Sequence, residues 1–253
     1  MHLRKRYFIF ISYDGTSYHG WQVQPGKITV QTKLEEALSV ILQENIKTTG
    51  AGRTDTGVHA RSFAAHFDSE KEDLAGNNNI IFRLNTYLPD DIAVSKIMAV
   101  DDQAHARYDA ISRTYKYYIS LQKDPFNRKY SWCRYGNLDI EAMNKASAYL
   151  MRYDDFTSFS KLHTQVKTNI CKIHEAGWVS DRNILVFTIK ANRFLRNMVR
   201  SIVGTMVTIG TGKMPPREME KIIKARDRSA AGVSAPAEGL FLEYIEYDQA
   251  IFL

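Results

Sequence analysis

The sequence contains only two cysteines, Cys133 and Cys171, among 253 residues. Two cysteines cannot build the disulfide framework that stabilises small secreted proteins. A chain of this length can bury roughly three quarters of the surface that its unfolded form exposes, so it needs neither a disulfide nor a metal to fold. We therefore expect a protein of the reducing cytoplasm.

Long apolar runs are also missing. No stretch approaches the roughly 18 apolar residues of a membrane-spanning helix. The apolar residues 7–13 follow a basic N-terminus, as in a signal peptide, but they end at Asp14-Gly15 with no small-residue cleavage site. We expect residues 6–13 to form a buried strand, and we expect no membrane partner.

The sequence lacks the common motifs for cofactors and nucleophiles. It has no Gly-x-Gly-x-x-Gly and no Gly-x-Ser-x-Gly, and Gly212-Lys213 is followed by Met214 where a phosphate-binding loop needs Ser or Thr. A zinc site could be built from Cys171, His174 and His163. The pattern around these residues predicts strands, on which successive side chains point to opposite faces, so structural or surface roles are favoured over a zinc site. We expect no cofactor and no metal.

The whole chain has 34 Lys+Arg and 28 Asp+Glu, so its formal net charge is only +6. The charge is unevenly distributed, because residues 183–217 contain no acidic residue. Residues 125–138 place Arg128 and Lys129 among four aromatic residues. Cations interleaved with aromatics suit a polyanion whose bases can stack, which indicates nucleic acid. A solvated face with ordinary core aromatics is the alternative.

The order of hydrophobic patterns predicts an α+β fold built from two ferredoxin-like βαββαβ halves, residues 1–104 and 105–253. We expect the halves to share a mostly antiparallel sheet, with a cleft between them. In the first half, strands are predicted at 6–13, 46–49, 62–67 and 92–100, and helices at 30–42 and 69–84. In the second half, strands are predicted at 113–121, 166–179, 184–190 and 239–247, and helices at 140–151 and 194–209.

The segment with the most chemistry is Gly50 to Ala60, a predicted loop that carries Arg53, Asp55 and His59. Its three glycines allow left-handed backbone and the close approach of another chain or a ligand. A loop aspartate also commonly forms a turn with the following amides, so local spacing alone leaves both a structural and a catalytic role open.

Two further segments place polar groups on predicted elements. On a helix from residue 194, Arg193, Arg196 and Arg200 would form a basic stripe opposite a broad apolar face, with Arg200 deep enough to need an anion. On a strand at 112–118, Arg113, Tyr115 and Tyr117 share one face. A core helix with a solvated face and an ordinary core tyrosine are the alternatives.

Together these segments resemble the TruA family of tRNA pseudouridine synthases, and the resemblance runs nearly end to end. Thr56 stands where the family more often has Ala, which leaves the neighbouring carboxylate untouched. The matching motifs, in chain order, are Tyr13-Asp14-Gly15-Thr16-x-Tyr18-x-Gly20-Trp21-Gln22-x-Gln24, Gly52-Arg53-Thr54-Asp55-x-Gly57-Val58-His59-Ala60, Ser112-Arg113-Thr114-Tyr115, Phe194-Leu195-x-x-Met198-Val199-Arg200 and Ala235-Pro236-Ala237-x-Gly239-Leu240.

The resemblance implies isomerisation of uridine to pseudouridine in the anticodon stem-loop of tRNA, at positions 38 to 40, by a homodimer without cofactor or metal. It makes Asp55 the catalytic aspartate, Tyr115 the active-site tyrosine and Arg200 the arginine paired with the aspartate. We expect these three to converge in the cleft. Substrate contacts are assigned to Arg53, which would hold the flipped-out nucleotide, and to His59 and Tyr115; RNA contacts are expected from Arg193, Arg196, Arg128 and Lys129.

Two other classes of function remain open from the sequence. A non-catalytic RNA-binding module explains the basic segments but leaves Asp55 without a role. A hydrolase of small substrates with an aspartate nucleophile leaves the charge distribution unexplained. Pseudouridine formation in tRNA distinguishes all three.

Overall fold

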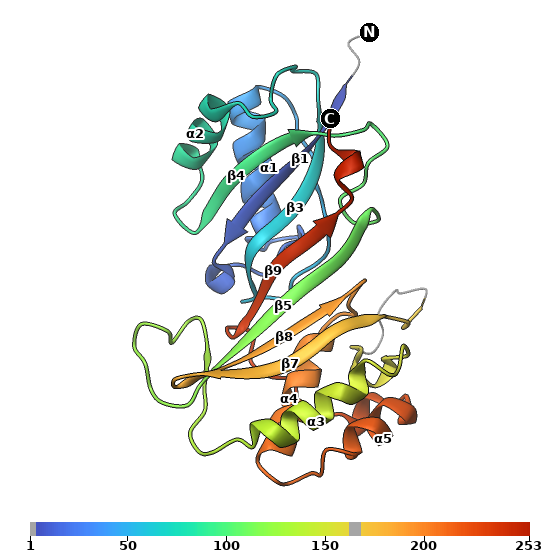
Figure 1. The fold of residues 1–253 in the computed structure, drawn as a ribbon. Coiled ribbons are helices and arrows are strands. Elements are labelled where there is room, and N and C mark those ends of the chain that lie inside the picture. The colour runs from blue at the N-terminus through green and yellow to red at the C-terminus, as the bar shows by residue number, and fades with distance from the viewer. Residues whose placement is uncertain (1–3, 162–167) are drawn as a thin grey trace. The chain divides into compact units, whose positions relative to one another are not determined.

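The computed structural model describes residues 4–161 and 168–253. The chain has α+β structure with mostly antiparallel strands, as predicted, and it divides into two compact units (Figure 1). Unit 1 comprises Met1–Ile111 together with Leu242–Leu253, and unit 2 comprises Ser112–Phe241. Unit 1 therefore takes in the C-terminal strand, which the sequence pattern placed with the second half.

Unit 1 follows the predicted order βαββαβ and is completed by that final strand. Its sheet has the order β4-β1-β3-β9, with β2 paired to β3. Strand β1 runs antiparallel to both of its neighbours. The elements are β1 (Lys5–Tyr13), α1 (Val30–Leu42), β2 (Thr49–Gly50), β3 (His59–Ser69), α2 (Asn78–Tyr87), β4 (Ile92–Ala99) and β9 (Leu240–Tyr247).

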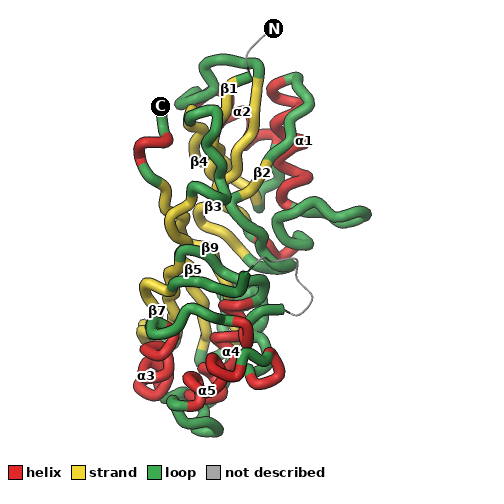
Figure 2. The backbone as a smooth tube through the Cα atoms, turned by 90° about the vertical axis from the view of Figure 1, so that its right-hand side faces the viewer, coloured by secondary structure: helices red, strands yellow, loops and turns green. Residues whose placement is uncertain are grey.

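Strand β1 lies inside the unit 1 sheet, and both of its faces are covered. Phe8 and Phe10 contact the rings of Tyr247 and Phe252, with 5.3 Å between the centroids of Phe8 and Tyr247. The alternate side chains point to the opposite face, on the side where α1 lies (Figure 2). Burial on both faces explains why this strand is a continuous apolar run in the sequence.

Helix α1 begins and ends at the predicted residues. The Thr29 hydroxyl caps it by accepting a hydrogen bond from the Thr32 N–H at 3.3 Å. Glu35 is the one charged residue of this helix that is buried. Its carboxylate accepts hydrogen bonds at 2.9 Å from the Thr48 N–H and from Gln31 Nε2, which satisfy the buried charge.

The helix predicted to start at the capping box of residues 69–72 starts later. Strand β3 extends through Ser69, whose hydroxyl donates to the Glu44 carboxylate at 2.9 Å instead of capping a helix. The N-cap of α2 is Asn77, whose side chain accepts N–H groups of the first turn. Strand pairing, a long-range interaction, therefore overrides the local capping signal.

Unit 2 has an antiparallel sheet in the order β5-β8-β7, to which β6 adds in parallel beside β5. Helices α3, α4 and α5 pack together (Figure 2). Helix α5 was not predicted, and part of the strand predicted at 166–179 lies outside the described residues. The elements are β5 (Ala110–Ser120), β6 (Trp132–Cys133), α3 (Ile140–Leu150), β7 (Ile173–Asp181), β8 (Ile184–Ala191), α4 (Met198–Gly210) and α5 (Glu218–Ala225).

Helix α4 starts at Met198, later than predicted, because Asn197 adopts a left-handed conformation with φ of 65°. Arg193 and Arg196 therefore lie in the loop before the helix. The predicted helical stripe that joins them to Arg200 is wrong. Arg200 lies in the first turn of α4 rather than near its middle.

Residues 101–109 of unit 1 are held against β3 by two histidines. His66 is 7% exposed, and its Nδ1 accepts the Ala106 N–H at 3.1 Å. The His105 ring meets the His66 ring edge-on, with centroids 4.6 Å apart. Burial lowers the pKa of His66 to about 4, and the charge of Arg6 adds to this effect. The ring is therefore neutral at pH 7, as an acceptor at Nδ1 must be.

Candidate active site

The glycine-framed segment at residues 50–60 contains the loop 51–58, which joins β2 to β3 and carries Asp55. The Val58 N–H donates to the Asp55 carbonyl at 3.2 Å, and Gly57 inside this turn has a φ of 79°. Asp55 is half-buried in the turn, whereas Arg53 is exposed. The loop thus keeps a carboxylate at a defined place and a cation at the surface beside it.

The segment that follows β1 packs against this loop. Gly20 has a φ of 80°, and a Cβ there would lie 2.2 Å from the Thr54 carbonyl oxygen. The hydroxyls of Tyr13 and Thr54 are hydrogen-bonded at 2.9 Å, and the Gly57 N–H donates to the Tyr18 carbonyl at 3.4 Å. The first two motifs of the sequence therefore form one structure, in which the first supports the Asp55 loop.

His59 is buried at the end of the same loop, with 1% of its surface exposed. The Gly15 N–H donates to its Nδ1 at 3.1 Å, and Asp14 Oδ1 lies 3.0 Å from the same nitrogen. These contacts tie the segment after β1 to the start of β3. The assignment of His59 to substrate contact stays a prediction.

Asp91 also holds the turn after β1, through two hydrogen bonds. The Tyr18 hydroxyl donates to the Asp91 carboxylate, and the Asp91 carbonyl accepts the Asp14 N–H at 2.9 Å. Burial raises the pKa of Tyr18 well above its ordinary value, so the hydroxyl remains a donor at neutral pH. The loop that carries Asp55 is consequently supported by a segment that is itself fixed.

Tyr115 lies on β5 in unit 2, opposite Ile189 of β8. It is half-buried, and its ring meets that of Phe194 at 87° with centroids 5.1 Å apart. Tyr117, the next residue on the same face of β5, donates its hydroxyl to the Pro236 carbonyl at 2.9 Å. The loop before α4 and the Ala-Pro-Ala motif therefore both contact the β5 face that carries Tyr115.

Arg200 is bonded to the Ala-Pro-Ala motif through its side chain and its backbone. Its Nε donates to the Ala235 carbonyl at 2.7 Å, and the Ala235 N–H donates to the Arg200 carbonyl at 2.9 Å. The Asn197 amide donates to the Ser234 hydroxyl at 2.6 Å just before the helix. These bonds fix the plane of the guanidinium, which decides where its remaining N–H groups point.

The predicted RNA-contact residues occupy two loops of unit 2. Arg128 and Lys129 are exposed between β5 and α3, beside Phe126, which is 90% exposed. Arg196 is exposed and Arg193 half-buried in the loop before α4. An exposed ring beside exposed cations has the chemistry that base stacking and phosphate binding require.

The three predicted catalytic residues are divided between the units. Asp55 belongs to unit 1, whereas Tyr115 and Arg200 belong to unit 2. Within unit 2, Phe194 and Arg200 come from one loop and helix, and Phe194 contacts Tyr115. The convergence of Asp55 with the other two residues stays a prediction.

Two supporting residues were missed from the sequence, Asp91 and Ala235. Asp91 follows Pro89-Asp90, which indicates only a turn. Ala235 lies in a recognised motif, but its contact with Arg200 joins residues 35 positions apart, and no local pattern signals it.

Among the described residues, no group of three or more His, Cys, Asp or Glu side chains could hold a metal ion. Neither Cys133 nor Cys171 forms a disulfide, and burial raises the pKa of Cys171 to about 11. His163, weighed above as a zinc ligand, lies outside the described residues. None of the described helices has the length and apolar character to cross a bilayer.

Comparison with known proteins agrees with the motifs. A family model described as tRNA pseudouridine synthase matches residues 9–109 and 146–248. The chain is 53% identical to tRNA pseudouridine synthase A of Bacteroides fragilis, with 98% of both chains covered. It is 40% identical to tRNA pseudouridine synthase A of Bacillus subtilis, covering 94% of this chain and 97% of that one. The fold and these matches define an isomerase that acts on RNA. The chain belongs to the tRNA pseudouridine synthase family, which confirms the resemblance drawn from its motifs.

Proposed function

We propose that this protein isomerises uridine to pseudouridine at positions 38 to 40 in the anticodon stem-loop of tRNA, with Asp55 as its catalytic carboxylate. Family membership supports the reaction and the class of RNA, and the resemblance of the five motifs supports the target positions. The observation that carries the catalytic assignment is the glycine-framed loop. It holds a half-buried carboxylate in a turn that a separate segment of the same unit supports.

The reaction breaks the bond between N1 of the base and C1′ of the ribose and forms a bond between C5 and C1′. The composition and the oxidation state of the nucleotide do not change, so the chemistry requires no redox partner and no energy source. What it requires is a group that assists cleavage at C1′ and a group that removes the proton from C5. Side chains of the chain can supply both.

Asp55 is assigned to the first step. Its carboxylate attacks C1′, as in retaining glycosidases, or removes a ribose proton on a route through a glycal. Both routes need an ionised carboxylate at a fixed distance from the sugar. The Val58-to-Asp55 hydrogen bond and the packing of Gly20 on Thr54 support such a fixed position.

Arg200 is assigned to the Asp55 carboxylate. An adjacent guanidinium keeps a carboxylate ionised even where the substrate excludes water. The bond from Nε to Ala235 supports this assignment, because it sets the guanidinium plane before substrate binds.

Tyr115 is assigned to the base. Its ring can stack on uracil, and its hydroxyl can take part in the removal of the C5 proton. The edge-on contact with Phe194 supports a stacking role, because it restricts the rotation of the ring.

The remaining residues bind and position the RNA. Arg53 is exposed beside Asp55 and is assigned to the flipped-out nucleotide, whose extrusion costs a few kcal/mol. His59 is assigned to positioning of the loop, because its side chain is buried. The two exposed loops with Arg128 and Lys129, and with Arg193 and Arg196, are assigned to phosphates, which provide affinity but little sequence selectivity.

The proposal includes a cytoplasmic homodimer. The cytoplasmic location follows from a tRNA substrate and from cysteines that form no disulfide. The dimer follows from the family resemblance, and light scattering at assay concentration tests it. A mass equal to one chain would remove it from the proposal.

The test is to incubate the protein with unmodified tRNA and to map pseudouridine along the product. We expect pseudouridine at positions 38 to 40 and at no other uridine. Binding without conversion would identify an RNA-binding module instead, and conversion at other positions would refute the target assignment while retaining the reaction.

A further inference from the structure

A surface groove of about 460 Å³ lies on unit 2, between α3 and the turn that precedes α5. Lys145, Tyr149 and Arg152 line one side of it, and residues 215–217 line the other. We call it the α3–α5 groove. None of its residues belongs to the loops that carry the predicted site and RNA-contact residues.

The charged residues that line the α3–α5 groove are all cations, namely Lys145, Arg152 and Arg217. Lys145 pairs with Glu141 at 2.7 Å, but both side chains are largely exposed, so this pair contributes little. Within the described parts of the chain, Arg152 and Arg217 make no ion pair with a carboxylate. The groove therefore presents net positive charge to solvent.

A neighbouring carboxylate, Glu220, does not neutralise this charge. It pairs with Lys224 at 2.9 Å and accepts a hydrogen bond from the Tyr153 hydroxyl. These partners and the more distant Arg152 lower the pKa of Glu220. Glu220 is thus already compensated by its own partners, and an anion in the groove would meet the cations first.

The cations are also partly fixed in position. Lys145 and Tyr149 are spaced at i and i+4 on one face of α3, and Arg152 follows the end of the helix, where its N–H donates to the Tyr149 carbonyl at 3.1 Å. The Arg152 guanidinium lies over the Tyr149 ring at 5.1 Å from its centroid, which restricts this long side chain. Pro215 and Pro216 have fixed φ angles and stiffen the opposite wall.

The number and the sign of the charges indicate what the groove binds. Lys145 on α3, Arg152 just after the end of that helix and Arg217 on the opposite wall place three cations around one groove. Several cations around one groove suit the phosphate backbone of a nucleic acid, because each phosphate contact releases condensed counterions. We propose that the α3–α5 groove is an additional binding surface for the sugar–phosphate backbone of tRNA. The proposal rests on the proposed function only in taking tRNA as the polymer.

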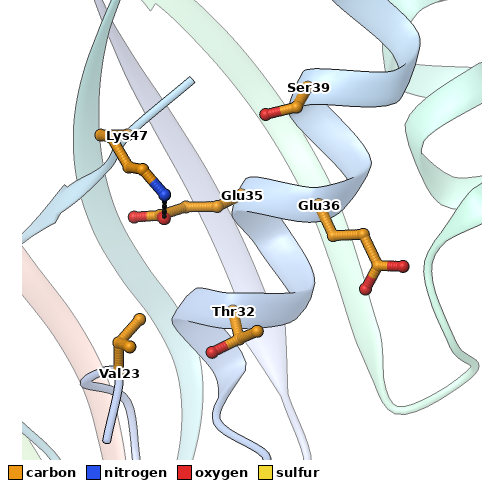
Figure 3. A pocket seen from close by; sticks show the side chains of 6 residues that line it. All are labelled: Val23, Thr32, Glu35, Glu36, Ser39 and Lys47. Carbon is orange, nitrogen blue, oxygen red and sulfur yellow. Dashed lines mark hydrogen bonds and ion pairs between the residues drawn. The ribbon is translucent and has the colours of Figure 1, made fainter. Parts of the chain in front are cut away.

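A second groove, on unit 1, shows the contrast and supplies a control (Figure 3). It measures about 240 Å³ and is lined by Glu35, Glu36 and Lys47 among others. Lys47 pairs with Glu35 at 3.1 Å, and the nearby Lys33 pairs with Glu36 at 3.2 Å. Carboxylates compensate both lysines, so this groove offers nothing to a phosphate.

The experiment compares two double variants that remove the same charge. Arg152→Gln with Arg217→Gln changes the α3–α5 groove, and Lys33→Gln with Lys47→Gln changes the control groove. Equilibrium binding of tRNA is measured without turnover, from 50 to 300 mM salt, after thermal melting has confirmed that each variant is folded. Turnover at saturating tRNA is measured separately.

For the groove variant we expect the slope of log K against log salt to fall by about 2, since each lost phosphate contact removes about 0.9. Affinity near 0.1 M salt should fall roughly 60-fold, with turnover at saturating tRNA unchanged. The control variant should keep the wild-type slope. Equal slopes in the two variants would overturn the proposal.

Binding of inorganic phosphate tests whether the groove takes a free small anion instead of the phosphates of an RNA strand. Saturable phosphate binding that the groove variant abolishes, together with an unchanged tRNA slope, would assign the groove to a small anion and would also overturn the proposal. The proposed function fails by a different result, namely absence of pseudouridine in the wild-type assay, which the binding slopes do not affect.

Discussion

Arg200 and Ala235 hold each other by two hydrogen bonds, one from the guanidinium Nε to the Ala235 carbonyl at 2.7 Å and one from the Ala235 N–H to the Arg200 carbonyl at 2.9 Å. The pair joins the first turn of α4 to the Ala-Pro-Ala motif. A guanidinium held in this way has a fixed plane, and only arginine can be held so, because lysine has no donor at the position of Nε.

The Arg200→Lys variant should therefore distinguish the effect of the positive charge from the effect of a fixed side-chain orientation. The substitution retains a cation but loses the bond to Ala235, and we expect turnover to fall by roughly 10²-fold, the typical loss for one preorganised donor. Single-turnover conversion of tRNA measures this. Arg196→Lys, in the exposed loop before α4, is the control and should change turnover by less than about twofold. Equal activity of both variants would show that the orientation of Arg200 is unimportant.

Asp55→Asn removes the charge and the nucleophile with little change in shape. The side chain lies in a loop, so we expect the variant to fold, and tRNA affinity should change far less than activity because phosphates provide most of the binding. Loss of an obligatory nucleophile should leave no conversion above background. Conversion, binding and melting are measured on one preparation. A tenfold loss of activity corresponds to only ~1.4 kcal/mol in the activation barrier. Residual activity within that range would therefore contradict the assignment of Asp55 as the nucleophile.

Tyr115→Phe retains the ring and its contact with Phe194 but removes the hydroxyl. If the hydroxyl acts in the removal of the C5 proton, turnover should fall by roughly 10²-fold or more, while tRNA affinity stays near the wild-type value. Rates and affinities of the two proteins are compared at the same salt. Equal turnover would leave Tyr115 with a stacking role alone.

Gly20→Ala tests whether the segment after β1 supports the Asp55 loop. A Cβ at this position would meet the Thr54 carbonyl oxygen at 2.2 Å, in addition to the cost of a positive φ. We expect a loss of roughly 3 kcal/mol in unfolding free energy and a fall in turnover, since the loop must move. Gly26→Ala is the matched control, because Gly26 has a φ of 68° with open space around it. It should cost only about 1 kcal/mol and leave turnover unchanged.

Acid should destabilise unit 1 through His66. Its pKa falls from 6.5 in the unfolded chain to about 4 in the folded protein, so between these values the unfolded state binds the extra proton. Stability from this group is complete above pH 6.5 and is lost as the pH falls toward 4, which amounts to about 2 kcal/mol between pH 7 and pH 5. Denaturant unfolding at both pH values measures it. The His66→Gln variant should be less stable at pH 7, but its free energy of unfolding should fall less between pH 7 and pH 5 than that of the wild type. An equal fall in both proteins would contradict the assignment of this acid sensitivity to His66.

Periodicity predicted most elements of the fold, because it reports the faces that each segment buries. Helix α1 and strands β1, β4 and β8 lie within a residue or so of their predicted bounds. The errors fall where long-range interactions override local signals. Ser69 has a capping motif but continues a paired strand, and Asn197 starts α4 with a left-handed residue that no pattern around it requires.

The motifs name the residues of the candidate site, whose catalytic roles stay predictions, but they do not show which contacts hold these residues in place. The motifs named Asp55, Tyr115 and Arg200 directly. They could not show that His59 is 1% exposed, since a histidine beside a loop glycine is equally consistent with a surface position. Nor could they pair Arg200 with Ala235, because that hydrogen bond depends on where a loop returns to a helix.

The chain leaves unit 1 after Ile111 and re-enters it at Leu242, so the sheet around the Asp55 loop receives its last strand from the far end of the chain. During translation, unit 2 is contiguous and emerges from the ribosome in one piece, whereas the edge of β3 that β9 covers waits for β9 to emerge. The nascent enzyme therefore acquires the loops proposed to bind RNA before the sheet behind its proposed catalytic aspartate is complete.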